Sequence, residues 1–217
     1  MQIVFLFYDN MTALDVIGPH EVLSRIPGAE IKRVALTKGV INTYAGDLKL
    51  IADYQLSEIS KADVLVVPGA GNATSLIEYP TILNWINTIH ETTTWTTSVC
   101  TGSLILGAAG LLKGLDATSH WAVLNQLPNW GAKPIQQRVV EAGKIITAAG
   151  VSAGIDMALL LTAKLTNDTI AQSLQLRLEY DPKPPFDTGS PQKASLEIIQ
   201  LAKQNLGDFN TSSDNKK

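Results

Sequence analysis

The sequence of 217 residues contains very little cysteine, since Cys100 is the only one. One cysteine cannot form an internal disulfide or a Cys-x-x-Cys motif. The three histidines, His20, His90 and His120, show no metal-ligand spacing, and no His-Glu-x-x-His motif occurs. We therefore expect no disulfide framework and no bound metal.

Positive charge is also sparse. Lysine and arginine number 17 against 20 acidic residues, and no basic block precedes Lys216 and Lys217. A protein that neutralises nucleic-acid phosphates needs a basic surface, so we expect no nucleic-acid partner. No apolar run approaches the roughly 20 residues that span a bilayer, so we expect no membrane association. The first residues lack the basic region and cleavage site of a secretory signal, so we predict a soluble cytoplasmic protein.

The rest of the composition is that of a globular protein, with 45% apolar and 17% charged residues. A chain of this length fits one well-packed domain better than two. We predict a single domain over residues 1–208 and a polar, disordered tail over residues 209–217.

Short apolar runs alternate with segments of helical pattern. The predicted strands cover residues 3–8, 31–36, 64–67, 95–99 and 145–147, and a hairpin is predicted over 138–147. The predicted helices cover residues 19–25, 80–91, 102–111, 153–165, 168–178 and 196–206. The proline-rich segment 181–186 is expected to run extended over the surface. This alternation predicts an α/β fold around a mostly parallel sheet.

Cys100 lies where a predicted strand runs directly into a predicted helix. Ser98 two residues before it and Gly102 two residues after it match the spacing of a nucleophile elbow. The start of a helix offers partial positive charge and free N–H groups, so we expect this position to favour the thiolate. A lone cysteine is more often a buried structural residue, but the elbow spacing favours a nucleophile.

Two other glycine-rich segments suggest different chemistry and are set aside. Residues 150–154 match Gly-x-Ser-x-Gly, but a hydrolase of that class needs a histidine after the serine, and all three histidines precede Ser152. We interpret Ser152 as the start of a helix that packs closely on the sheet. Residues 69–71 begin like a dinucleotide fingerprint but have Thr74 in place of the third glycine, so no nicotinamide cofactor is expected.

Asp15 follows the first predicted strand and is surrounded by apolar residues. Carboxyl ends of parallel strands converge on one crevice, so Asp15, the Gly69 to Gly71 loop and Cys100 are expected to meet there. An apolar setting and a nearby thiolate both raise the pKa of a carboxyl group, which suits a proton donor that shares one proton with the thiol. The alternative for Asp15 is a helix cap.

His120 and Trp121 follow Thr118 and Ser119 and could line the same crevice. A single histidine ahead of a helix is more often a capping or packing residue, and a single tryptophan more often belongs to the core. We include both in the candidate substrate-binding set as pocket residues.

Taken in order, several segments of the chain resemble the ThiJ/PfpI superfamily, and within it the members that hydrate isocyanides. The segments are 14–19 (Leu-Asp-Val-Ile-Gly-Pro), 67–71 (Val-Pro-Gly-Ala-Gly), 98–103 (Ser-Val-Cys-Thr-Gly-Ser), 117–121 (Ala-Thr-Ser-His-Trp), 150–156, 175–180 and 184–191. The resemblance implies a flavodoxin-like three-layer sandwich that forms a homodimer.

The resemblance further implies a catalytic Cys100 and Asp15, with Thr101, Gly69, Gly71 and Val151 added to the substrate-binding candidates His120 and Trp121. The reaction that it implies is hydration of an isocyanide to an N-substituted formamide without a cofactor. Some members carry a histidine directly after the cysteine, where this chain has Thr101, which disfavours peptidase activity. Two alternatives stay open: a non-catalytic or redox-sensing stress protein, and a glyoxalase-like activity on 2-oxoaldehydes.

Overall fold

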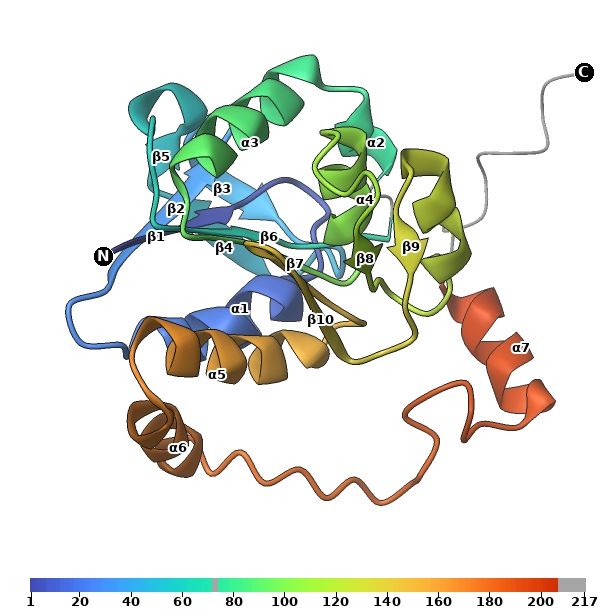
Figure 1. Cartoon of the computed structure of the whole chain (residues 1–217). Helices are drawn as coiled ribbons and strands as arrows, with labels where there is room; N and C mark the ends of the chain where they lie inside the picture. The colour runs from blue at the N-terminus through green and yellow to red at the C-terminus, as the bar shows by residue number, and fades with distance from the viewer. Residues whose placement is uncertain (72–73, 207–217) are drawn as a thin grey trace, which may run out of the picture.

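The computed structural model describes residues 1–71 and 74–206, and its centre is a seven-stranded sheet (Figure 1). The strand order is β10-β11-β7-β6-β1-β2-β5, and every neighbouring pair is parallel except β10 with β11. The strands are β1 (Gln2–Leu6), β2 (Glu30–Ala35), β5 (Tyr54–Gln55), β6 (Val64–Val67), β7 (Trp95–Val99), β10 (Val139–Ala142) and β11 (Ile145–Ala148). The four residues of β6 are all buried, as expected for a strand covered on both faces.

Helices cover both faces of the sheet. In Figure 1, α1 (Ala13–Leu23) and α5 (Ala153–Leu165) lie side by side below it, with α6 (Asp168–Arg177) packed against α5. On the other face lie α2 (Thr74–Ile77), α3 (Pro80–Thr92) and α4 (Gly102–Ala108). The prediction of a three-layer α/β sandwich around a mostly parallel sheet is therefore confirmed.

Several short elements escape a periodicity analysis because they lack a strand-length or helix-length apolar pattern. They are the hairpin β3 (Gly39–Asn42) with β4 (Lys49–Ala52), the pair β8 (Asp116–Ala117) with β9 (Lys133–Pro134), and the 3-10 segments Leu56–Glu58 and Leu124–Trp130. None of the helices in the described part of the chain is long and apolar enough to cross a membrane.

The first helix is the largest error of the sequence prediction. It begins at Ala13 instead of residue 19, so Pro19 lies inside it and one helical hydrogen bond is missing. Close packing of α1 on α5 offsets this loss, because a Cβ on Gly154 would stand only 3.1 Å from the Pro19 ring and a Cβ on Gly18 only 3.0 Å from Ile155. The early start places Asp15 in the first turn of the helix.

Other boundaries differ by a few residues. The helix predicted over 102–111 ends at Ala108, and the chain turns at Gly110, with φ of 83°. The helix predicted over 168–178 ends at Arg177, and Asn167 caps its start by accepting a bond from the Ile170 N–H.

The chain after α6 has no helix or strand until α7 (Leu196–Asn205), and residues 181–186 are exposed, as predicted for the proline-rich segment, although bends begin at residue 185. The tail predicted over residues 209–217 lies outside the described residues and stays a prediction, as does the single-domain boundary at 208.

Replacing Gly102 by alanine should destabilise the fold. A Cβ at this position would stand 2.3 Å from the carbonyl oxygen of Val67, so α4 would have to move away from β6. We expect a loss of about 3 kcal/mol in the free energy of unfolding, measured by urea denaturation. Gly189→Ala is the matched control, because a Cβ there meets no atom within 4 Å. Equal stability of the two variants would contradict the proposed contact.

Candidate active site

Four adjacent parallel strands bring the candidate residues to one edge of the sheet. Asp15 follows β1, Gly69 follows β6, Cys100 follows β7 and Val151 follows β11, and these strands are neighbours in the order β1-β6-β7-β11. The order along the sheet reverses at β1, and ligands bind at such a switch point beyond the carboxyl ends of the strands. The sequence prediction that these segments meet is therefore correct.

Cys100 adopts a left-handed backbone conformation, with φ of 59°, which is uncommon for a residue with a side chain. Its own N–H donates to the carbonyl oxygens of Ala148 and Ala149, at 3.1 and 3.0 Å. The turn is tight enough that a Cβ on Gly69 would lie 2.9 Å from the Cβ of Cys100. The backbone strain is therefore localised at Cys100, and such strain is common at functional sites.

Two backbone N–H groups face the sulfur of Cys100, those of Thr101 and Val151, and both lower the pKa of the thiol. Val151 holds its N–H in place with φ of 34°, an outlying value for a β-branched residue. N–H groups aimed at one atom stabilise negative charge there. The strained conformation of Val151 thus contributes to an anion-stabilising environment for the sulfur.

Asp15 is completely buried, and its Oδ2 accepts a 2.9 Å bond from the Gly69 N–H. Its other oxygen, Oδ1, has no partner of normal hydrogen-bond geometry among the described residues. Burial raises the pKa of the carboxyl from 3.8 to about 7, although the bonds from Gly69 and the Cys100 thiol act in the opposite direction. The expected upward shift is present, with desolvation as its main cause.

The thiol of Cys100 behaves differently from the sequence-based expectation. The residue is 1% exposed, and burial followed by the charge of Asp15 raises its pKa well above 9.0. The expectation that the helix start would favour an exposed thiolate is wrong, because desolvation and a neighbouring carboxylate outweigh the two N–H groups.

Together the two side chains form a coupled pair. The first proton leaves with a pKa of about 7 and the second only far above it, so the pair holds one proton over a wide range above pH 7. Because the pKa of the thiol lies well above that of the carboxyl, this proton resides mainly on the sulfur. Its transfer to Asp15 gives a thiolate next to a carboxylic acid, which is the form that addition of a thiol across a multiple bond requires.

Tyr8 is a member of this site that the sequence analysis did not identify. Its buried hydroxyl donates a 2.9 Å bond to the carbonyl oxygen of Pro68, and Asp15 and Cys100 both raise its pKa after burial does. The peptide that accepts this bond is the one whose N–H, on Gly69, donates to Asp15. A tyrosine at the end of a buried strand carries no sequence signal beyond its position next to the crevice.

Two of the candidate substrate-binding residues serve mainly to hold the backbone. The hydroxyl of Thr101 bonds to both the N–H and the carbonyl oxygen of Ala70, each at 2.8 Å, which ties the cysteine turn to the glycine loop. Gly71 lies against the ring of Tyr44, and a Cβ there would approach it to 2.8 Å. Direct contact of either residue with substrate stays a prediction.

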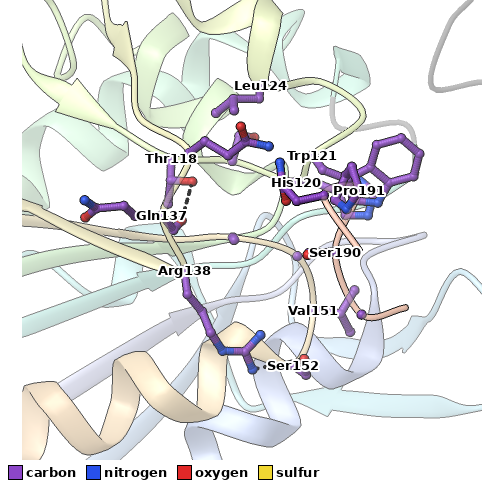
Figure 2. Close-up of a pocket in the computed structure, with 16 residues that line it drawn as sticks. Thr118, His120, Trp121, Leu124, Gln137, Arg138, Val151, Ser152, Ser190 and Pro191 are labelled. Carbon is purple, nitrogen blue, oxygen red and sulfur yellow. Dashed lines mark hydrogen bonds between the residues drawn. The ribbon is translucent and has the colours of Figure 1, made fainter. Parts of the chain in front are cut away.

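Next to the buried pair lies a cavity of about 390 Å³, whose lining side chains are drawn in Figure 2. Val151, His120 and Trp121 all line it, so these three candidates are brought together. His120 also packs so closely on Gly150 that a Cβ there would approach its ring to 2.7 Å. Cys100 and Asp15 do not line the cavity, but Ser119 and Ala149 of its wall hydrogen-bond the backbone of Cys100.

The chain belongs to the DJ-1/PfpI family, whose model matches residues 1–164. Among proteins of known name, it is 40% identical over 204 residues to a protein of Pseudomonas putida called isonitrile hydratase, a match that covers 94% of this chain and 89% of that protein.

The solved structures agree with this assignment. A crystal structure of a ThiJ/PfpI family protein from Pseudomonas syringae superposes with a TM-score of 0.92 at 38% identity, covering 96% of this chain and 86% of that one. The oxidised DJ-1 of Toxoplasma gondii gives a TM-score of 0.73 at 21% identity over 83% of this chain and 99% of its own, which shows a shared fold.

Because the pKa of Asp15 is raised in the folded chain, the native chain should become less stable as pH rises. A carboxyl with a pKa of about 7 when folded and 3.8 when unfolded stabilises the fold fully below pH 3.8, and this stabilisation is lost as pH rises through 7. The difference corresponds to roughly 4 kcal/mol. Asp15→Asn keeps an oxygen for the Gly69 N–H and cannot ionise, so it should be more stable than the native chain at pH 8 and similar at pH 4.

Urea denaturation at several pH values measures this effect. Asp47→Asn, which alters an exposed carboxyl, is the control for the loss of a negative charge. An Asp15→Asn variant whose stability runs parallel to that of the native chain from pH 4 to pH 8 would contradict the pKa of about 7.

Proposed function

We propose that this chain hydrates isocyanides to N-substituted formamides, with Cys100 as nucleophile and Asp15 as general acid and base. The observation that carries the proposal is the pairing of a buried thiol and a buried carboxyl around one proton. The 40% identity to the isonitrile hydratase of Pseudomonas putida over most of both chains supports the reaction class.

The reaction begins with the form of the pair that has the proton on Asp15. The thiolate of Cys100 attacks the terminal isocyanide carbon and forms the S–C bond, and Asp15 transfers its proton to the same carbon, giving a thioimidate. Asp15, now a carboxylate, takes a proton from water as the water oxygen adds to that carbon. Asp15 passes this proton to the nitrogen, which gives a tetrahedral intermediate bearing S, OH and NH on one carbon. The C–S bond then breaks while Asp15 takes the hydroxyl proton, so N-substituted formamide leaves with the thiolate of Cys100 and the carboxylic acid of Asp15 restored. No cofactor takes part in these steps.

The backbone supports both charge states of this cycle. The N–H groups of Thr101 and Val151 stabilise the thiolate before attack and when it is expelled. The Gly69 N–H stabilises the carboxylate of Asp15 during the second half of the reaction. Because these donors belong to the chain itself, they need no reorganisation when the charge moves between the two side chains.

Burial of the sulfur restricts which electrophiles can reach it. An isocyano group is linear and only two atoms long, so it is narrow at its reacting end. A 1% exposed cysteine is more compatible with such a group than with a bulky acyl donor.

The same burial argues against the two alternative functions. A redox-sensing cysteine is oxidised according to its exposure and thiolate character, and Cys100 is buried with a raised pKa. For a glyoxalase-like activity, the residue after the cysteine is Thr101, whose hydroxyl is occupied by Ala70 and provides no base.

Formamide production from an aryl isocyanide by the purified protein tests the proposal. Cys100→Ala should abolish turnover, and Asp15→Ala should lower kcat/KM by at least about 10²-fold, the usual loss for a general acid or base. In the native chain kcat/KM should rise with pH through about 7, because the pair must lose one proton before a thiolate forms. Circular dichroism checks that both variants fold. Turnover by folded Cys100→Ala would remove the nucleophile assignment.

Tyr8 is proposed as a positioning residue for Asp15. Its bond to the Pro68 carbonyl polarises the peptide whose N–H stabilises the Asp15 carboxylate. Tyr8→Phe should therefore raise the pKa of Asp15 and move the acid limb of the kcat/KM profile to higher pH by about 0.3 to 0.5, since cooperativity changes a bond by roughly a quarter of its strength. A lower rate at every pH with an unmoved limb would show a purely structural role.

The homodimer and the cytoplasmic location implied by the sequence and its resemblance stay predictions.

A further inference from the structure

The cavity beside Cys100 has one wall that comes from a distant part of the chain. His120, Trp121 and Leu124 form one side, and residues 189–192, on the irregular segment between α6 and α7, form another. Figure 2 shows Ser190 and Pro191 opposite Val151 and next to the His120 and Trp121 side chains. Residues 189–192 lie beyond the part of the chain that matches the family model, which ends at residue 164. This wall therefore comes from residues outside the matched family model.

The cavity is placed to receive whatever is attached to the reacting group. Val151 lines it and directs its N–H at the sulfur, and Ser119, also in the wall, donates a 3.1 Å bond to the carbonyl oxygen of Cys100. An isocyanide with its terminal carbon at the sulfur has its nitrogen and substituent on the outer side of the buried pair. The neighbouring cavity is the space available for that substituent.

The volume indicates a substituent larger than a single ring. At about 30 Å³ for each water in the liquid, a cavity of about 390 Å³ corresponds to roughly 13 heavy atoms. A phenyl or cyclohexyl isocyanide has eight heavy atoms in total, of which two belong to the reacting group, and would leave much of the cavity unfilled.

The lining indicates an uncharged and amphipathic substituent. Among the described residues that line the cavity there is no aspartate or glutamate, and their one arginine, Arg138, already pairs with Asp156 and donates to the hydroxyl of Ser152. A charged substituent would lose its hydration in the cavity and would find no unpaired residue of opposite charge there among the described lining residues. Trp121 and Leu124 offer apolar surface, and amide or hydroxyl groups come from Gln136, Gln137, Ser190 and Gln192.

We propose that the cavity between His120–Trp121 and residues 189–192 binds the isocyanide substituent and selects uncharged, amphipathic substituents larger than one ring and no larger than roughly 13 heavy atoms, such as an aryl amide. This inference rests on the proposed hydratase function. Residues 189–192 then determine specificity, while Cys100 and Asp15 perform the reaction.

Gly189 allows the cavity to be filled without strain. It lines the cavity, and a Cβ at this position meets no atom within 4 Å. Gly189→Phe should lower kcat/KM for N-phenyl-2-isocyanoacetamide at least 10-fold and leave that for methyl isocyanide within about twofold. In the native chain, 4-isocyanobenzamide should be preferred to 4-isocyanobenzoate at least 10-fold. Leu176→Phe, which enlarges an exposed side chain on α6, is the control.

A binding measurement separates this inference from the proposed function. Cys100→Ala should bind the stable product 4-formamidobenzamide, and the double variant Cys100→Ala/Gly189→Phe should bind it at least 10-fold more weakly, by isothermal titration calorimetry. If no isocyanide is hydrated by the native chain, the proposed function fails, and this comparison still decides the role of the cavity. Equal binding by the two variants, equal loss of activity on small and large isocyanides, or preference for the benzoate would each overturn the inference.

Discussion

The site depends on one interaction, that of the buried carboxyl of Asp15 with the buried thiol of Cys100. In water the carboxyl and the thiol would lose their protons independently, because their pKa values lie several units apart. Burial raises both, and their proximity couples them, so that one proton is shared by two atoms next to each other. The Gly69 N–H stabilises a negative charge on Asp15, and the N–H groups of Thr101 and Val151 stabilise a negative charge on Cys100. In the proposed function, this shared proton is what lets Asp15 act as the acid and Cys100 as the nucleophile.

The parallel sheet holds several strained or closely packed backbone positions of the site in place. Cys100 and Val151 hold positive φ values, and Gly69 and Gly102 stand so close to neighbouring backbone that no side chain fits. Such features persist only where the surrounding structure fixes them. Here β6 and β7 are fully or almost fully buried and pair in register from Val64 with Trp95 to Val67 with Ser98, which fixes the positions of the loops that follow them.

The sequence predicted the features that depend on local pattern. Strands β6 and β7 and helix α5 have the predicted bounds, and β6 shows the continuous apolar run that a buried parallel strand leaves in the sequence. The meeting of Asp15 with Cys100 followed from the topology of parallel sheets. Features that depend on packing were missed or wrong. The start of α1 depends on its contact with α5, and the pKa of Cys100 depends on the extent of its burial. The proposed role of Tyr8 depends on its hydrogen bond to Pro68, which lies 60 residues further along the chain.

On the proposed function, chemistry and selectivity occupy different parts of the chain. Asp15 lies in the first turn of α1, and Cys100 lies in the turn that directly follows β7, so their geometry tolerates little change without loss of the fold. Residues 189–192 belong to an irregular segment with no strand or helix to maintain, and they line the cavity from outside the part of the chain that matches the family model. On the proposed function, sequence change there would alter the shape of the cavity without disturbing the coupled proton. Irregular segments that line a site in this way can change which substrate fits while the scaffold that holds the chemistry is kept.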